Sequence, residues 1–155
     1  MQGHPPILVV EDNENDVTLI RRTLTRARIP NPLRLVGSGE EAIAYLVRAA
    51  TYSDRENYPF PALVLLDLKL PGIDGFAVLQ WIRQQRHFMN DLRVVVLTSS
   101  HSLRDVKKVY RLGANSFLVK PLEFQNIHEI FATLQWHLTE TTAMPVQPPS
   151  TVGVK

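Results

Sequence analysis

The stretch Ala62-Leu63-Val64-Leu65-Leu66-Asp67 decides the fold, because five apolar residues in succession are closed by an acid. A short uninterrupted apolar run is typical of a strand buried on both faces of a parallel sheet. Open α/β folds bind their ligands at the carboxyl ends of such strands. The stretch therefore predicts that Asp67 lies at a functional edge.

Three other apolar runs end in the same way. They are Ile7–Val10 before Glu11 and Asp12, Arg93–Leu97 before Thr98, and Ser116–Val119 before Lys120. Because the carboxyl ends of parallel strands meet at one edge, three carboxylates, a hydroxyl and an ammonium should converge there. This combination indicates a site for a divalent cation and a phosphoryl group.

Helical patterns alternate with these runs. Val17, Ile20, Leu24 and Ala27 form one apolar stripe at helical spacing. Residues 51–61 are polar and predict a loop or ragged helix end before the Asp67 strand. Alternating strands and helices predict a parallel sheet covered on both faces, with right-handed crossovers.

Size and composition limit the class of protein. With 155 residues, 45% of them hydrophobic, we expect one domain over residues 7–138, a disordered N-terminus over 1–6 and a disordered Pro- and Thr-rich tail over 139–155. A net charge of +2 argues against a nucleic-acid or membrane surface. The chain has no cysteine, no membrane-length apolar run and no signal-peptide pattern, so we expect a cytoplasmic protein.

The acids suggest specific chemistry. Oxygen ligands from Glu11, Asp12 and Asp67 suit Mg²⁺ or Mn²⁺. A bound cation would neutralise charge on a phosphoryl group, so that anionic Asp67 could attack the phosphorus. The structural alternative is that Glu11 and Asp12 only cap the helix that begins near Glu14.

Thr98 and Lys120 complete the pattern. The hydroxyl of Thr98 can hydrogen-bond a phosphoryl oxygen, although a β-branched residue at a strand end is also ordinary. Packing explains an ammonium between Val119 and Pro121 poorly, whereas a phosphoryl oxygen would be a natural partner for it. Pro121 makes a cis peptide bond after Lys120 accessible, and such a bond could aim the lysine side chain into the site.

These motifs resemble a known family. Val9-Val10-Glu11-Asp12-Asn13, Leu65-Leu66-Asp67-Leu68-Lys69-Leu70-Pro71, Leu97-Thr98-Ser99 and Lys120-Pro121 resemble the signatures of response-regulator receiver domains, over Ile7 to Leu138. The resemblance implies a flavodoxin-like, doubly wound sheet of five parallel strands in the order 2-1-3-4-5, with helices on both faces. It also implies phosphotransfer from a histidine kinase to Asp67.

The same resemblance assigns roles around Asp67. Glu11 and Asp12 would help to hold Mg²⁺, with the backbone carbonyl of Lys69 as a further ligand. Thr98 and Lys120 would take the phosphoryl oxygens. Phe117 would be the aromatic residue whose rotamer follows the state of Thr98.

Three features are similar to the small regulators paired with bacterial and cyanobacterial phytochromes. They are the pattern Glu-Asp-Asn-x-x-Asp over residues 11–16, the long loop over 51–61, and residues 95–101. They imply a bacteriophytochrome as the kinase. The segment Lys120-Pro121-Leu122-Glu123 departs from that subgroup and resembles an ordinary receiver.

The expected function is therefore a single-domain response regulator that signals through protein contacts and is not an enzyme. As the receiver resemblance implies, the signalling surface should be the helix from Leu103, the strand Ser116–Val119 and the helix that follows Phe124. We expect a homodimer through this face, because a two-fold interface could pair its opposite charges reciprocally, with phosphorylation at most tightening it. Its helices carry the mixed charges Asp105, Lys107, Lys108, Arg111, Glu123 and Glu129, and the stripe Phe124, Ile127, Phe131, Leu134 and Leu138 should face mainly the core.

Two alternatives belong to other classes of protein. An aspartyl-phosphate-forming phosphohydrolase acting on a small substrate usually has a second carboxylate two positions after the nucleophile, where this chain has Lys69. A flavodoxin-like cofactor protein would need a glycine-rich phosphate loop after the first strand, which the sequence lacks.

Overall fold

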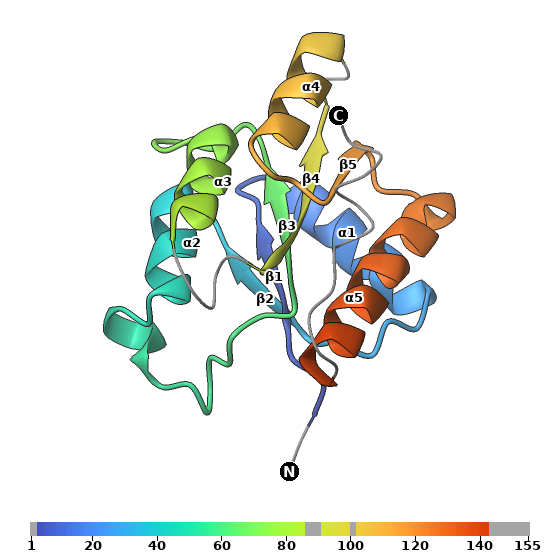
Figure 1. The fold of residues 1–155 in the computed structure, drawn as a ribbon. Coiled ribbons are helices and arrows are strands. Elements are labelled where there is room, and N and C mark those ends of the chain that lie inside the picture. Colours follow the sequence, from blue (N-terminus) through green and yellow to red (C-terminus); the bar gives the residue numbers. More distant parts are fainter. Residues whose placement is uncertain (1–2, 86–90, 100–101, 143–155) are drawn as a thin grey trace.

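A computed structural model describes residues 3–85, 91–99 and 102–142 of the chain, with side chains as far as Gln135. Its centre is a five-stranded parallel sheet in the order β2-β1-β3-β4-β5 (Figure 1), which confirms the expected topology. The strands are β1 (Ile7–Val10), β2 (Leu33–Val36), β3 (Leu63–Asp67), β4 (Arg93–Thr98) and β5 (Ser116–Val119).

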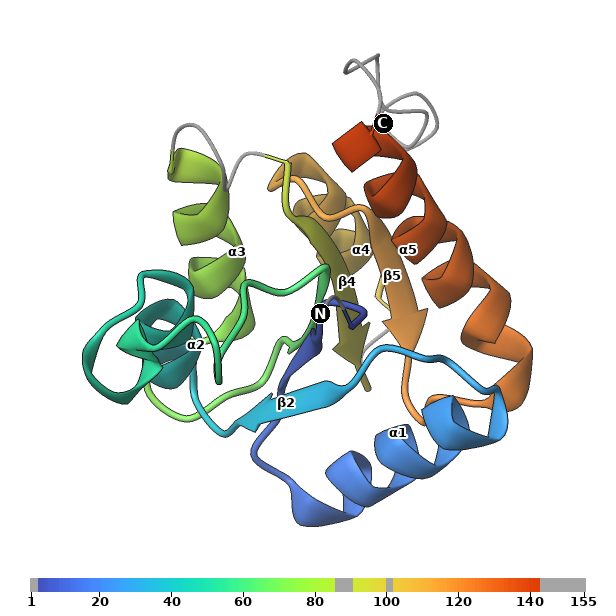
Figure 2. The same cartoon turned by 90° about the horizontal axis from the view of Figure 1, so that it is seen from below.

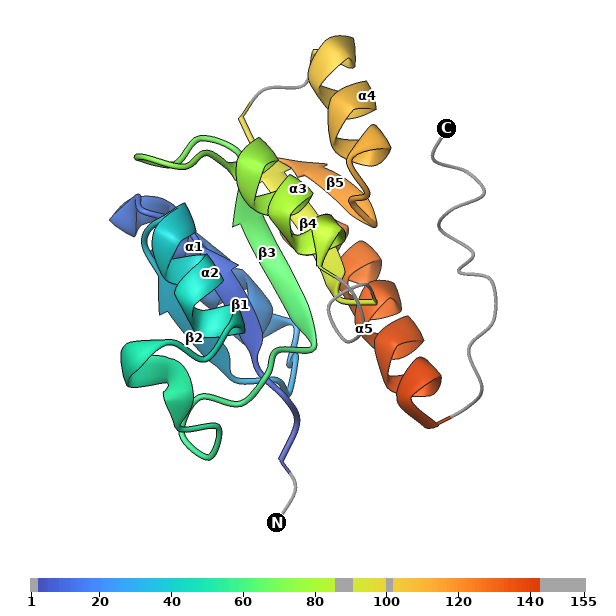
Figure 3. The same ribbon diagram turned by 60° about the vertical axis from the view of Figure 1, so that its left-hand side comes forward.

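The helices cover the sheet on both faces. They are α1 (Glu14–Arg26), α2 (Gly39–Leu46), α3 (Gly75–Gln84), α4 (Leu103–Arg111) and α5 (Ile127–Thr142), with short 3₁₀ turns η1 (Ala50–Ser53) and η3 (Phe124–Asn126). Side chains of α2, α3 and α4 form one core with the sheet, and those of α1 and α5 form the other. Figures 2 and 3 show the two helix layers on opposite sides of the strands.

The strand register brings the site residues to one edge. β1 pairs with β3 so that Val10 lies opposite Leu66, and β3 pairs with β4 so that Asp67 lies opposite Leu97. Thr98, the next residue of β4, lies opposite Val119 of β5. The residues that close β1, β3, β4 and β5 therefore lie side by side, as the sequence predicted.

Polar caps set where the helices begin. Asn13, Ser38, Asp74 and Ser102 each accept a hydrogen bond from the backbone N–H three residues later, at the starts of α1, α2, α3 and α4. Gly113 follows the end of α4 and has a φ of +107°, a positive value that glycine adopts without steric strain.

The ends of the domain extend past the expected boundaries. Pro6 is buried, its carbonyl accepts a hydrogen bond from Ala62 N–H, and the Pro5 carbonyl accepts one from Asn31, so the ordered chain begins before Ile7. Helix α5 continues to Thr142, beyond Leu138. The rest of the predicted tail, residues 143–155, lies outside the described residues. Within the described part, no helix is long and apolar enough to cross a membrane.

The expected inward stripe of the last helix is partly wrong. Ile127, Ile130 and Leu134 are buried, but Phe124 is 57% exposed and Phe131 is 44% exposed. Phe124 belongs to the turn η3, not to α5, so its side chain does not follow the helical phase. The sheet covers only one side of α5, so the apolar stripe of this helix is wider than the part of its surface that the sheet buries.

Candidate functional site

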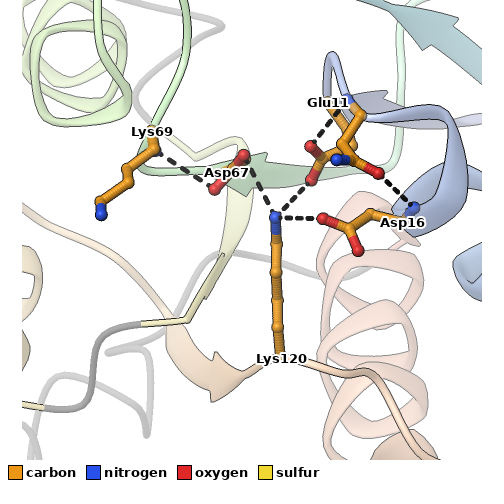
Figure 4. Close-up of polar contacts among 6 residues, drawn as sticks. Glu11, Asp16, Asp67, Lys69 and Lys120 are labelled. Atoms are coloured by element: carbon orange, nitrogen blue, oxygen red, sulfur yellow. Dashed lines mark hydrogen bonds and ion pairs between the residues drawn. The ribbon is translucent and has the colours of Figure 1, made fainter.

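Asp67 is the buried centre of the site. It ends β3, is only 4% exposed, and lies between two nitrogen groups (Figure 4). Lys69 N–H donates a hydrogen bond of 3.2 Å to Asp67 Oδ1, and Lys120 Nζ lies 3.2 Å from Asp67 Oδ2. The exposed Lys69 side chain points away from Lys120, so the backbone of Lys69 is the part near the site.

Glu11 and Asp12 follow β1 and meet Asp67. One carboxylate oxygen from each of the three residues lies within 4.8 Å of the others. Glu11 is buried and its Oε2 accepts a 3.1 Å hydrogen bond from Asn13 N–H, whereas Asp12 is exposed. Asn13, and neither acid, caps α1, so the alternative that these acids merely cap the helix is wrong.

Lys120 follows β5, and its peptide bond to Pro121 is cis, the form that the proline makes accessible. Its Nζ lies 2.8 Å from Glu11 Oε1, 2.8 Å from Asp16 Oδ2 and 3.2 Å from Asp67 Oδ2. Burial alone would lower the pKa of Lys120, but the hydrogen bond to Asp16 and the carboxylates of Glu11 and Asp67 raise it above its ordinary value. The ammonium is therefore charged wherever the protein is folded at physiological pH.

Thr98 lies on β4, the strand between those that carry Asp67 and precede Lys120, and Phe117 lies on β5, the strand that Lys120 follows. Thr98 ends β4, is 1% exposed, and its carbonyl accepts a 2.8 Å hydrogen bond from Lys120 N–H. Phe117 of β5 is half-buried against the core that the sheet forms with α2, α3 and α4. The structure thus brings Glu11, Asp12, Asp67, Lys69, Thr98 and Lys120 to one edge of the sheet, while Phe117 lies opposite Val96, further inside the sheet. The roles of all these residues stay predictions.

The donor set fits a hard divalent cation. All the candidate ligand atoms are oxygens, as Mg²⁺ and Mn²⁺ prefer. Among the described residues, buried Glu11 Oε1 accepts no well-aligned hydrogen bond, and the Lys120 ammonium and the Asn13 N–H offset the charge of the carboxylate. Burial, with the nearby Asp67 charge, raises the pKa of Glu11 against the opposing effect of Lys120. A bound cation would relieve this surplus of buried negative charge.

A cleft of about 510 Å³ opens beside the site. Asp12, Lys69 and Thr98 line it, together with Asp74 and Phe76 at the start of α3 and Asp105 of α4. The cleft therefore leaves the strand ends accessible from the side of α3 and α4.

Sequence reasoning assigned no role to two residues that shape this site. Asp16, on the first turn of α1, contacts Lys120, and the only sequence signal for it was its place at the end of the pattern Glu-Asp-Asn-x-x-Asp over residues 11–16. Gly75 begins α3, and a Cβ there would clash with the Asp67 carbonyl oxygen and lie 2.6 Å from Leu68 Cα. Pro71-Gly72-Ile73-Asp74-Gly75 has the composition of a turn, but this composition does not show that Gly75 packs against the Asp67 backbone.

Comparisons with known proteins agree with this geometry. The sequence profile described as the response regulator receiver domain matches residues 7–132. Response regulator Rcp1 of Synechocystis sp. is 35% identical over 146 residues, covering 93% of this chain and 97% of Rcp1. The fold is similar to the Mn²⁺-bound form of Rcp1, with a TM-score of 0.68, 35% identity and coverage of 93% of this chain and 99% of that one.

Two further solved structures are similar. The bacteriophytochrome response regulator RtBRR has a TM-score of 0.75 and 36% identity, over 97% of this chain and 88% of that one. The phosphorylated cyanobacterial phytochrome response regulator RcpA has a TM-score of 0.69 and 31% identity, over 94% of this chain and 99% of that one.

Proposed function

The chain belongs to the response regulator receiver family, and from this premise we propose that Asp67 accepts a phosphoryl group from a histidine kinase. One observation carries the proposal most strongly. A buried carboxylate at a strand end lies within 3.2 Å of a lysine ammonium and within 4.8 Å of two further acids. This arrangement supplies a nucleophile, a positive charge for a phosphoryl oxygen and the ligands for a cation.

In the proposed reaction an Asp67 carboxylate oxygen attacks the phosphorus of a phosphohistidine. The new P–O bond replaces the P–N bond, and the electron pair of that bond returns to the imidazole nitrogen. Glu11, Asp12, Asp67 and the Lys69 backbone carbonyl would hold Mg²⁺ or Mn²⁺, which when bound neutralises charge on the phosphoryl oxygens. Lys69 N–H, already bonded to Asp67 Oδ1, keeps the carboxylate oriented.

The remaining site residues would read the phosphorylated state. Lys120 and the Thr98 hydroxyl would each meet a phosphoryl oxygen, and movement of Thr98 would let the Phe117 ring change rotamer. Half-burial of Phe117 supports this role, since its ring touches both the core and the surface. The change would then reach the surface formed by α4, β5 and α5.

The product is a signal, not a released compound, and the protein would act without enzymatic turnover on a small substrate. A phosphohydrolase needs a general acid near the nucleophile, and Lys69 instead places an exposed ammonium two positions later. No observation favours that alternative. We also propose a cytoplasmic location, which is typical of receiver domains.

A phytochrome is the proposed kinase. The support is that RtBRR and RcpA, which this chain resembles over most of its length, are phytochrome response regulators. Direct binding to nucleic acid is not part of the proposal, because the chain carries a net charge of only +2.

The proposed output surface is a homodimer interface formed by α4, β5 and α5. Val119 of β5 is 38% exposed and Leu103 of α4 is 68% exposed, which gives this face apolar area. Arg111 of α4 and Glu129 of α5 are both exposed, so a two-fold arrangement could pair opposite charges reciprocally. Phosphorylation at Asp67 would at most tighten this interface.

Phosphotransfer tests the proposal directly. A phosphorylated histidine kinase, with a bacteriophytochrome kinase as the first choice, is mixed with the protein and Mg²⁺. Borohydride reduction followed by peptide mass spectrometry should locate the phosphoryl group on Asp67. Transfer to another residue, or none from any of several kinases or from acetyl phosphate, would contradict it.

A further inference from the structure

The contact between Asp16 and Lys120 joins the first turn of α1 to the loop after β5. Asp16 Oδ2 lies 2.8 Å from Lys120 Nζ, and the two residues are 104 positions apart in the sequence. The Asp16 side chain is 33% exposed, and its backbone N–H is already used by the Asn13 cap. Helix capping therefore accounts for the Asp16 backbone but leaves the direction of its side chain unexplained.

The three contacts of the Lys120 ammonium are not equivalent. Among the described residues, only Asp16 accepts a hydrogen bond with good geometry from Nζ, and Glu11 and Asp67 form ion pairs with it. Asp67 Oδ2 is the most distant of the three carboxylate oxygens, at 3.2 Å from Lys120 Nζ. The ammonium thus rests closer to α1 than to the proposed phosphorylation site (Figure 4).

Asp16 also differs from the other two acids in what it can bind. Glu11 and Asp67 belong to the cluster that could hold a metal ion, whereas Asp16 does not. A cation bound to Glu11 and Asp67 would weaken their hold on Lys120 and leave the Asp16 contact in place. A cavity of only about 10 Å³ adjoins the pair, lined partly by Leu19, Leu97 and Pro121, so apolar side chains closely confine the lysine stem.

We propose that Asp16 is a positioning residue that holds the Lys120 ammonium toward α1 in the unphosphorylated protein and so opposes its capture by a phosphoryl group. This inference rests on the proposed phosphorylation of Asp67. Lys120 must give up or lengthen its Asp16 hydrogen bond to approach a phosphoryl oxygen on Asp67. Asp16 thereby shifts the equilibrium toward the unphosphorylated conformation without touching the cation or the phosphoryl group.

Beryllofluoride, which mimics the phosphoryl group on a carboxylate, tests the inference in the intact protein at saturating Mg²⁺. Calorimetric titration of Asp16→Asn should show binding about three- to tenfold tighter than in the wild type, the range expected for one partly exposed charge-assisted hydrogen bond. Asp16→Glu, which keeps the carboxylate, should stay closer to the wild type.

Glu14→Gln is the matched control, because it removes the same charge from an exposed position on the same helical turn. It should change beryllofluoride affinity by less than about twofold. Mn²⁺ affinity without beryllofluoride should differ by less than about twofold between Asp16→Asn and Glu14→Gln, whereas a merely structural role for Asp16 would lower both affinities in Asp16→Asn.

The outcomes separate the inference from the function beneath it. Unchanged or weaker beryllofluoride binding by Asp16→Asn, or an equal shift in Glu14→Gln, overturns the role of Asp16 while wild-type binding still supports phosphorylation. A wild-type protein that binds no beryllofluoride, or an Asp67→Asn variant that binds it equally well, overturns both.

Discussion

Lys120 Nζ lies 3.2 Å from Asp67 Oδ2 although β4 separates their two strands in the sheet. The lysine side chain therefore crosses the carboxyl end of β4, where Thr98 lies. Three strand ends meet around one point as a result. A phosphoryl group on Asp67 would be within reach of a hydroxyl and an ammonium that different segments of the chain supply.

Asp67 should be the sole phosphorylation site. Acetyl phosphate with Mg²⁺ should add one phosphoryl group to the wild-type protein, and Asp67→Asn should abolish the addition because the amide is not a nucleophile. Intact-protein mass spectrometry measures the change. Asp74→Asn is the control, since asparagine also caps α3 and leaves the strand ends unaltered. Undiminished labelling of Asp67→Asn would refute the assignment.

Divalent-cation affinity should fall as the pH is lowered. Burial raises the pKa of Glu11 above its ordinary value of 4.5, so the folded protein keeps a proton there at a higher pH than the unfolded chain does. The contribution of protonated Glu11 to the stability of the folded protein is present below the pKa of Glu11 in the unfolded chain. It is lost as the pH rises through the pKa of Glu11 in the folded protein. The same proton competes with the cation.

Mn²⁺ titrations between about pH 7.5 and about pH 5 should therefore show progressively weaker binding. Glu11→Gln should bind Mn²⁺ more weakly at neutral pH and with a shallower pH dependence. An affinity that is independent of pH in the wild type would contradict the assignment of Glu11 as a ligand. Phosphorylation by acetyl phosphate should stop in excess EDTA.

Lys120→Ala should destabilise the metal-free protein and block its response to phosphorylation. Removing the ammonium leaves buried Glu11 and Asp67 without their shared cation, so the free energy of unfolding should fall by about 1–3 kcal/mol. Mg²⁺ should still bind and restore part of the loss. Urea unfolding with and without Mg²⁺ measures this, and Lys69→Ala, which removes an exposed ammonium, should have little effect. Equal losses in the two variants would contradict the role of Lys120.

Gly75→Ala should cost about 1–3 kcal/mol of stability and impair phosphorylation, because it overpacks the start of α3 against the Asp67 backbone. The atoms in the way are backbone atoms that no rotamer change can move. Gly37→Ala is the control, since its nearest neighbour would be Glu41 Oε1 at 3.9 Å. Thermal unfolding of both variants tests this, and a wild-type midpoint for Gly75→Ala would show that the contact is unimportant.

The proposed dimer should appear in sedimentation of the free and beryllofluoride-treated protein. Arg111→Glu on α4 should weaken association, whereas Arg22→Glu, an exposed residue of α1 outside the proposed interface, should not. A monomer in both states at roughly tens of micromolar would exclude the dimer.

The sequence by itself predicted the type of sheet and most of the site residues, and its resemblance to receiver domains implied the strand order. Short, uniformly apolar runs alternate with helical stripes, and this pattern requires a parallel sheet covered on both faces. Once the strands are parallel, their carboxyl ends share an edge, so Glu11, Asp67, Thr98 and Lys120 had to meet there. The turn composition over residues 71–75 and the glycine at 113 were also legible, because local backbone chemistry sets them.

Only the tertiary structure decided how neighbouring helices, strands and loops pack against one another. The Asp16 contact with Lys120 depends on where α1 lies relative to the loop after β5, which no local pattern encodes. The exposure of Phe131 depends on how much of α5 the sheet covers, because periodicity gives the direction of an apolar stripe but not how much of it a neighbouring element buries. Phe124 is exposed because it lies on the turn η3 before that helix. The same holds for Gly75, whose requirement arises from one backbone passing against another.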